Sequence, residues 1–202
     1  MNKKEIAAYF DRQAPDWDRR MVTDDGKIGF ILDTAGVREH TTVLDVACGT
    51  GVLFPYYLAR NASRVIGVDI SIEMARIAAA KLHDPRVEVI CGDIESIPAR
   101  ILCDCCVVYN AFPHFVDPAR LIGCLAHWVK PGGRLTVAHG MGLDALHRHH
   151  AGRAEHVSRE MLIPQELTAL FAPWFEVDTA LADDEKYVVS GVRSRKQKEN
   201  EI

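Results

Sequence analysis

The chain has 202 residues, of which 48% are hydrophobic and 26% are charged, and its formal net charge at pH 7 is -4. This length suits one domain with a modest appendage, and the balance excludes disordered, collagen-like and coiled-coil proteins. A mildly acidic chain is a poor general binder of nucleic acid or anionic membranes, so we expect neither as a partner. These properties favour a small-molecule pocket and leave the oligomeric state open.

The N-terminal segment contains two early lysines, but its apolar stretch is too short for a signal peptide. No window approaches the ~18 apolar residues of a membrane span. The six cysteines lack the spacing of a disulfide framework, so we expect a cytoplasmic protein. Alternation along a strand would place Cys103 and Cys106 of the C-x-x-C pattern on opposite faces, which predicts buried thiols and no metal site.

Two helices are predicted before the first strand. Ile6, Tyr9 and Phe10 follow helical spacing, so we expect a short amphipathic helix over residues 3–12, with a break at Pro15. A second helix should begin at residue 30, after a break flanked by the glycines at 26 and 29, and should end near residue 36. We therefore expect a helical cap (1–36), an α/β domain (37–193) and a disordered tail (194–202).

Strands and helices then alternate along the chain. Apolar, β-branched runs predict strands over residues 42–46, 64–69, 87–91, 103–109, 134–139, 175–180 and 186–192, and helices are expected over 52–60, 72–82, 118–128 and 164–171. Ser71 should cap its helix, and Pro131-Gly132-Gly133 should form a tight turn before the fifth strand. The alternation requires a mostly parallel sheet with helices on both faces. The last two strands are too close for a crossover helix, so one strand should insert antiparallel at an edge.

Polar residues gather where the parallel strands end. The first strand ends in Asp45-Val46-Ala47-Cys48-Gly49-Thr50-Gly51, the second ends at Asp69, and Asp93 and Asn110 follow the third and fourth. In a doubly wound sheet, ligands bind at these ends, and an acid about 20 residues beyond the glycine turn can accept hydrogen bonds from both ribose hydroxyls. The turn lacks the third glycine of a dinucleotide site and no P-loop follows it. The pattern therefore predicts a ribose site without provision for pyrophosphate.

The run Val43–Gly51 resembles the first motif of class I S-adenosylmethionine-dependent methyltransferases, and the segments around Asp69, Asp93 and Pro131-Gly132-Gly133 resemble the later motifs. The resemblance covers about residues 5–192 and extends to the small "type 11" group that includes quinone-biosynthesis methyltransferases, whose N-terminal cap is similar to Tyr9-Phe10-Asp11 with Trp17-Asp18. It implies an α/β three-layer sandwich with a mostly parallel seven-stranded sheet and an antiparallel last strand. It also implies S-adenosylmethionine as the cofactor, with S-adenosylhomocysteine as the product.

The same resemblance implies roles for the residues at the strand ends. Gly49 and Gly51 would lie against the methionine part of the cofactor, Ala47 stands where the family has its first glycine, and Asp45 would hold the amino group. The rest of the predicted cofactor site comprises Asp69 at the ribose, Asp93 and the Ile94 N–H at the adenine, Ile70 and Met74 on its two faces, and Asn110 at the end of the fourth strand.

Three histidines are candidates for a catalytic base, and each could instead have a structural role. His139 ends the fifth strand and should face the mouth of the pocket, His147 lies on a helical stretch, and His114 follows the fourth strand. An apolar acceptor pocket could be walled by aromatic residues, namely Tyr9, Phe10, Trp17, Phe112 and Phe115, whereas Trp128 should belong to the core.

Two functions therefore remain open. One is methyl transfer to a small-molecule acceptor, for which the sequence carries no substrate motif. The other is cofactor binding without transfer, as in a partner subunit or a sensor. A nicotinamide dehydrogenase is disfavoured by the missing third glycine and by the short hairpin formed by the last two strands.

Overall fold

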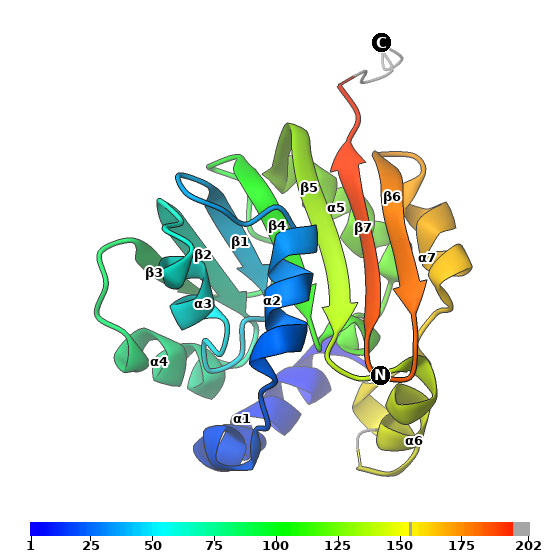
Figure 1. Ribbon diagram of the computed structural model, residues 1–202. Coiled ribbons are helices and arrows are strands. Elements are labelled where there is room, and N and C mark those ends of the chain that lie inside the picture. Colours follow the sequence, from blue (N-terminus) through cyan, green and yellow to red (C-terminus); the bar gives the residue numbers. More distant parts are fainter. Residues whose placement is uncertain (154, 196–202) are drawn as a thin grey trace.

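The computed structural model describes residues 1–153 and 155–195, so most of the predicted tail lies outside the described residues. Seven strands form one sheet in the order β3-β2-β1-β4-β5-β7-β6 (Figure 1). Strands β1 to β5 are parallel, and β7 pairs antiparallel with both β5 and β6. Their bounds are Thr42–Val46, Arg64–Asp69, Val87–Cys91, Cys103–Tyr109, Val129–His139, Phe175–Ala182 and Tyr187–Arg193. The predicted fold class is confirmed.

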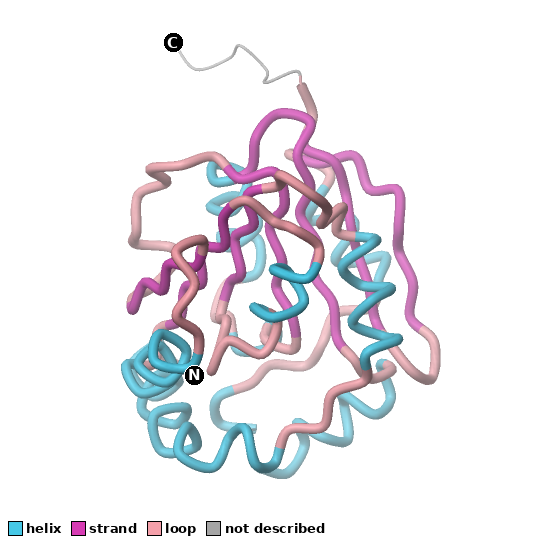
Figure 2. The backbone as a smooth tube through the Cα atoms, turned by 60° about the vertical axis from the view of Figure 1, so that its left-hand side comes forward, coloured by secondary structure: helices cyan, strands magenta, loops and turns pink. Residues whose placement is uncertain are grey.

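Helices cover both faces of the sheet. Their bounds are α1 Lys3–Arg20, α2 Asp25–Thr34, α3 Phe54–Ala59, α4 Ile72–Lys81, α5 Pro118–Trp128, α6 Leu143–Arg153 and α7 Pro164–Phe171, with 3₁₀ turns η1 Phe112–His114 and η2 Glu155–Val157. Helices α2 and α3 lie on one face and α5 and α7 on the other, while α1 and α6 lie at the end toward which the parallel strands point (Figures 1 and 2). No described helix has the length and apolar character needed to cross a bilayer.

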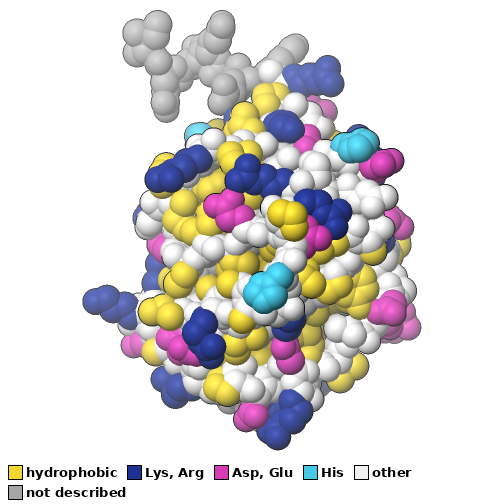
Figure 3. Space-filling model, turned by 90° about the vertical axis from the view of Figure 1, so that its left-hand side faces the viewer, with side chains coloured by type: hydrophobic (Ala, Val, Ile, Leu, Met, Phe, Trp, Pro, Cys, Tyr) yellow, Lys and Arg dark blue, Asp and Glu magenta, His cyan; other side chains and the backbone are white. Residues whose placement is uncertain are grey.

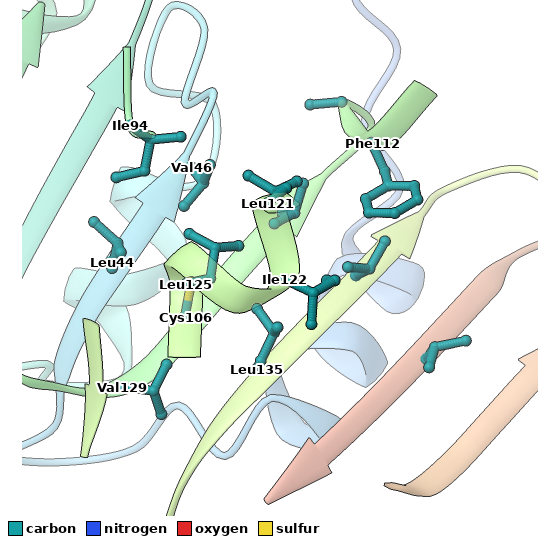
Figure 4. Packing of buried hydrophobic residues seen from close by; sticks show 14 of the residues in the cluster. Leu44, Val46, Ile94, Cys106, Phe112, Leu121, Ile122, Leu125, Val129 and Leu135 are labelled. Atoms are coloured by element: carbon teal, nitrogen blue, oxygen red, sulfur yellow. The ribbon is translucent and has the colours of Figure 1, made fainter. Parts of the chain in front are cut away.

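Two buried clusters hold the layers together. On one face, α5 packs its Leu121, Ile122 and Leu125 onto strand residues that include Leu44, Cys106 and Leu135 (Figure 4). On the other face, side chains of α2 and α3 pack against β1 and β2. This second cluster includes Ile28, Leu32, Phe54, Tyr57, Val43 and Val65. Because both faces are covered, the central strands are almost continuously apolar in sequence. At the β3 edge, basic and acidic side chains are interspersed among apolar ones (Figure 3).

Helix α1 does not break at Pro15, and the predicted end of this helix was wrong. Proline removes one backbone hydrogen bond and strains the preceding turn, which favours a break in an isolated helix. Contacts on both sides of Pro15 favour the continuous helix here. Phe10 and Trp17 pack edge to face with their ring centroids 5.7 Å apart, and Asp18 accepts a hydrogen bond from Thr50 Oγ1 at 2.5 Å.

The predicted start of α2 was also wrong. The helix begins at Asp25, and both Gly26 and Gly29 lie inside it. Asp24 caps it by accepting a hydrogen bond from the Lys27 N–H at 3.0 Å. An aspartate cap offsets part of the cost of the two glycines, and this capping signal was present in the sequence.

Pro131-Gly132-Gly133 do not form a separate turn, because β5 already begins at Val129. The register between β4 and β5 shifts instead: Cys103 pairs with Val129, whereas Cys105 pairs with Arg134. The prediction that Cys103 and Cys106 lie on opposite faces was wrong, because both belong to the apolar cluster on one face, whereas Cys105 belongs to the cluster on the other. Both thiols, like that of Cys105, are buried as predicted.

Candidate functional site

A pocket opens where the parallel strands end, and the pocket with its mouth encloses about 1180 Å³. Residues after β1, β2, β3 and β4 line it, and α1 covers it from the side. Every predicted cofactor residue except Gly51 lines this pocket: Asp45, Ala47, Gly49, Asp69, Ile70, Met74, Asp93, Ile94 and Asn110.

The glycine turn after β1 requires unusual backbone angles. Ala47, Gly49 and Gly51 have φ values of 55°, 56° and 77°, in the left-handed region that glycine adopts most easily. Ala47 and Gly49 line the pocket. Gly51 faces the protein interior, where a Cβ on it would lie 2.6 Å from the ring of Phe54. Position 51 therefore requires glycine because of its backbone angle and because a side chain there would collide with Phe54.

Gly51→Ala should lower the free energy of unfolding by about 2–5 kcal/mol. The left-handed backbone costs a non-glycine residue about 1–2 kcal/mol, and overpacking against the buried Phe54 ring adds about 1–3 kcal/mol. Urea denaturation measures the change. Gly29→Ala is the matched control, because its Cβ would meet nothing closer than 3.8 Å and the residue lies within α2. If Gly51→Ala lowers the free energy of unfolding no more than Gly29→Ala does, the packing account is contradicted.

Asp69, at the end of β2, ties two loops of the pocket together. Its side chain accepts hydrogen bonds from the Gly49 N–H and the Ser71 N–H, both at 2.8 Å. Ser71 caps α4 as predicted, by accepting a hydrogen bond from the Met74 N–H. Burial raises the pKa of Asp69 to about 6 despite these two backbone donors. The Asp69 carboxylate thus lines the pocket as a hydrogen-bond acceptor with a raised pKa.

Asp45, within β1, is a second buried carboxylate and is only 2% exposed. Its Oδ2 atom has no hydrogen-bond partner among the described residues. Burial, and next to it the charge of Asp69, raise the pKa of Asp45 well above its ordinary value. A buried acceptor without a partner costs free energy, so a positively charged group in the pocket would stabilise this site.

Asp93 lies at the far side of the pocket, where its Oδ2 accepts hydrogen bonds from Lys3 Nζ at 2.7 Å and from Ser96 Oγ at 2.9 Å. Burial would raise the pKa of Asp93, but these donors outweigh that effect and lower it. Lys3 also pairs with Glu95, whose side chain is only 2% exposed. Neither Lys3 nor Glu95 was identified from the sequence, since neither belongs to a recognisable motif.

Three charged side chains of α1 hold the loops that line the pocket. Lys3 binds the loop after β3, as described above. Asp11 accepts hydrogen bonds from Ser71 Oγ at 2.6 Å and from the Glu73 N–H at 3.1 Å, at the start of α4. Asp18 contacts Thr50 of the glycine turn and pairs with Lys81 Nζ at 2.6 Å. Helix α1 is therefore fastened to the loops that follow β1, β2 and β3.

Asp11→Ala should increase amide hydrogen exchange in α1 about tenfold while leaving exchange in the sheet unchanged. A hydrogen bond to a charged group contributes about 1.5–3 kcal/mol, and an isolated helix of this length is marginal in water, so α1 should lose protection once undocked. Asp16→Ala is the control, because Asp16 forms only an exposed pair with Arg19. Equal protection of α1 in the two variants would show that Asp11 does not fasten it.

Of the three candidate histidines, His114 alone lines this pocket. Its Nδ1 lies 3.0 Å from the Val157 carbonyl oxygen and 3.2 Å from Ser158 Oγ. Because a carbonyl only accepts, Nδ1 carries the proton and Nε2 is the basic nitrogen of the ring. The His114 ring packs edge to face on Phe10, at 4.8 Å between centroids. His114 is thus held in one tautomer at the wall of the pocket.

The expectation that His139 faces the pocket was wrong. It is 1% exposed, does not line the pocket, and packs edge to face on Tyr187 at 6.2 Å. The physical reason is the antiparallel pairing of β7, which places Tyr187 directly beside His139. His147 also lies elsewhere, with Nε2 3.1 Å from the Met161 carbonyl oxygen.

The aromatic wall is smaller than predicted. Phe10, Trp17 and Phe115 line the pocket, whereas Tyr9 does not and Phe112 is fully buried in the core. Trp128 is a core residue, as expected. Lining residues that the sequence did not indicate follow α1 directly, at Met21, Val22 and Thr23. Asn110, which also lines the pocket, has a φ of 54°, and its Oδ1 accepts a hydrogen bond from the Gly140 N–H at 2.9 Å, which joins the ends of β4 and β5.

Comparison with known proteins agrees with this arrangement. Residues 43–133, which include the glycine turn, Asp69 and Asp93, match the methyltransferase domain family. The resemblance to class I methyltransferases is confirmed. A ubiquinone biosynthesis O-methyltransferase of Serratia proteamaculans is 31% identical over 115 residues, which cover 54% of this chain and 46% of that protein. The chain spans about a third to a half of the length of the curated relatives matched first.

Solved methyltransferase structures share the fold. A chain from the complex of the Haloferax volcanii Trm112 methyltransferase activator with a methyltransferase superposes with a TM-score of 0.77 at 21% identity, covering 96% of this chain and 98% of that one. The N-methyltransferase NodS of Bradyrhizobium japonicum, solved with S-adenosyl-L-homocysteine, gives a TM-score of 0.74 at 13% identity, covering 93% and 98%. At these identities the likeness extends to the fold alone.

Proposed function

We propose that the chain binds S-adenosylmethionine and catalyses transfer of its methyl group to a small-molecule acceptor. The observation that carries this proposal is the pair of buried carboxylates, Asp45 and Asp69, that line a pocket at the ends of β1 and β2 within the matched domain. When bound, the cofactor supplies a methyl group on a positively charged sulfur, which leaves as a neutral thioether once the acceptor has taken the methyl.

The pocket fits this cofactor in its charge. Among the described residues, four carboxylates line the pocket, at Asp45, Asp69, Asp93 and Glu95, against a single lysine. An ammonium group would give the buried Asp45 Oδ2 the partner that the described residues do not provide. Asp69 would accept hydrogen bonds from the two ribose hydroxyls, which a carboxylate can bind in bidentate fashion.

The adenine end fits as well. Ile70 and Met74 line the pocket beside Asp69 and provide apolar contacts for the faces of a flat ring. Asp93 would accept a hydrogen bond from an exocyclic amino group while retaining its contact with Lys3. Ile94, which follows Asp93 directly, would donate its backbone N–H to the ring.

His114 would act as a general base on the methyl acceptor. The Val157 carbonyl oxygen and Ser158 Oγ orient the ring, and Nε2 would take the proton from an acceptor hydroxyl or amine as that atom bonds to the methyl carbon. The aromatic cover formed by Phe10 and Trp17 would exclude water from the transfer. The protein would also align the methyl acceptor with the methyl group of the cofactor.

The affinity for S-adenosylhomocysteine should fall as the pH is lowered through about 6. Burial raises the pKa of Asp69 to about 6, and only its ionised form accepts from both ribose hydroxyls. Below that pH the free protein must release a proton on binding, so the dissociation constant should rise by up to about tenfold per pH unit, and the contribution of Asp69 should level off above about pH 7. Asp45 would act in the same direction, since its pKa is also raised.

Calorimetric titrations between about pH 5 and pH 8 measure this dependence, and Asp69→Asn is the control because it cannot ionise. The slope below pH 6 should be smaller in the variant than in the wild type. A wild-type affinity that is independent of pH would contradict the role of Asp69 as an ionised acceptor.

The proposed activity can be tested with methyl-labelled S-adenosylmethionine and the small-molecule fraction of a cell extract. We expect the wild type to move label from the cofactor to an extractable small molecule, and Asp69→Ala to move far less. Binding of S-adenosylhomocysteine without transfer to any fraction would favour a non-catalytic partner or sensor instead.

A further inference from the structure

The side chain of Asp45 lies on the face of the sheet that α2 and α3 cover. Successive side chains of a strand point to opposite faces. The neighbours Leu44 and Val46 belong to the cluster under α5, whereas Val43 belongs to the cluster under α2 and α3. Asp45 therefore shares the face of Val43, although its carboxylate also lines the pocket at the end of β1.

Helix α3 packs directly onto this part of the sheet. Asp45 lies between Gly67 of β2 and Val107 of β4. A Cβ on Gly67 would lie 2.5 Å from the ring of Phe54, so α3 rests on the residue beside Asp45. Tyr57 follows Phe54 by three positions, which places it on the same side of the helix. It packs in the same cluster as Val107, so α3 brings its phenol ring toward Asp45.

The Tyr57 hydroxyl and the Asp45 carboxylate lie together in the protein interior. Tyr57 is 0% exposed, and neither its hydroxyl nor Asp45 Oδ2 has a hydrogen bond of ordinary geometry among the described residues. Burial and then the Asp69 charge raise the pKa of Asp45, and the nearby Tyr57 hydroxyl opposes them. Burial also keeps the pKa of Tyr57 well above its ordinary value, so the phenol retains the proton that it can donate.

We propose that Tyr57 is a positioning residue that donates a hydrogen bond to ionised Asp45 and thereby prepares Asp45 to bind the ammonium group of the cofactor. This inference rests on the proposed function, because it concerns the residue that would hold that ammonium. Two nearby carboxylates such as Asp45 and Asp69 disfavour each other's ionisation, and a donor on the interior side offsets this. Tyr57 does not line the pocket, so it would act only through Asp45.

The variant Tyr57→Phe removes the hydroxyl alone, and two probes show which part of the cofactor site it affects. S-adenosylhomocysteine carries the ammonium, whereas 5′-methylthioadenosine keeps the adenine, ribose and thioether but lacks the amino-acid part. We expect Tyr57→Phe to weaken S-adenosylhomocysteine binding about tenfold at about pH 7, the typical effect of losing a hydrogen bond to a charged group. The affinity for 5′-methylthioadenosine should be unchanged. Calorimetry on the full chain measures both affinities.

The loss should also depend on pH, which a structural defect would not produce. The hydrogen bond favours the ionised form of Asp45, so without it more of the free protein must release a proton on binding. The difference between variant and wild type should therefore narrow as the pH rises from about 7 to about 9, because Asp45 then ionises in both proteins. Besides Asp69 and Tyr57, the thiols of Cys48 and Cys106 lie near Asp45. Burial raises the pKa of both thiols well above its ordinary value, so they stay neutral.

Two further variants serve as controls. Tyr187 is also 0% exposed with a hydroxyl that has no hydrogen-bond partner among the described residues, but it lies on β7, which β4 and β5 separate from β1. Tyr187→Phe should leave both affinities unchanged. In an Asp45→Asn background, Tyr57→Phe should weaken S-adenosylhomocysteine binding by less than about twofold, since the group through which it acts has been altered.

Four results would each overturn the inference while leaving the proposed function intact. These are an unchanged affinity of Tyr57→Phe for S-adenosylhomocysteine, an equal loss for both probes, a loss that does not vary with pH, and a loss that persists in full in the Asp45→Asn background. Failure of S-adenosylhomocysteine to bind the wild type would overturn the proposed function and this inference with it.

Discussion

Replacing His114 with alanine should lower the rate of methyl transfer by about 10²–10⁴, the usual cost of removing a general base. The effect should appear in kcat, because in the proposed function His114 acts on the methyl acceptor and does not bind the cofactor. Its Nδ1 is held by the Val157 carbonyl oxygen, so the loss concerns a pre-oriented Nε2. Single-turnover rates with the identified acceptor measure the change.

Two comparisons separate catalysis from stability. The affinity of His114→Ala for S-adenosylhomocysteine should stay within about twofold of the wild type. His147→Ala is the matched control, because His147 also contacts a backbone carbonyl but does not line the pocket. If His114→Ala retains wild-type turnover, or if His147→Ala is equally slow, His114 is not the base.

The substitution Asp69→Ala should weaken S-adenosylhomocysteine binding about ten- to a hundredfold. A hydrogen-bonded charged contact contributes about 1.5–3 kcal/mol, which corresponds to that range in affinity. The fold should survive, because a buried carboxylate whose pKa is raised to about 6 destabilises the native state at neutral pH. Calorimetry gives the affinity, and circular dichroism shows whether the variant is folded.

Asp178→Ala serves as the control for Asp69→Ala. This variant also removes a carboxylate with a partner, because Asp178 pairs with Arg134. Asp178, however, lies on β6, away from the pocket. The affinity of the Asp178→Ala variant for S-adenosylhomocysteine should equal that of the wild type. An unchanged affinity in a folded Asp69→Ala variant would refute the ribose assignment.

The sequence predicted best what depends on local pattern. The bounds of β1 to β4 and the cap at Ser71 follow from short apolar runs and from one capping residue, and the structure confirms them. The residues at the strand ends were located for the same reason, since the ends of parallel strands meet at one edge. These pocket-lining residues were therefore predictable from the sequence, except Gly51, which faces the protein interior.

Non-local contacts explain what the sequence could not show. His139 ends its strand as predicted, but its burial depends on Tyr187, which arrives through the antiparallel β7. Helix α1 continues through Pro15 because Asp18 finds partners far along the chain, in Thr50 and Lys81. Lys3 reaches Asp93 across 90 residues, a pairing without any signal in sequence. These contacts exist only once the sheet has formed.

Thermal denaturation with S-adenosylhomocysteine and, in parallel, with NAD tests the central claim most directly. A ligand that binds only the native state at a hundred times its dissociation constant stabilises it by about 2.7 kcal/mol, or roughly 5–10 °C in Tm for a chain of this size. Since Asp45, Asp69 and Asp93 line a pocket without a dinucleotide turn, S-adenosylhomocysteine should give this shift and NAD should give none. A shift with NAD and none with S-adenosylhomocysteine would contradict the account.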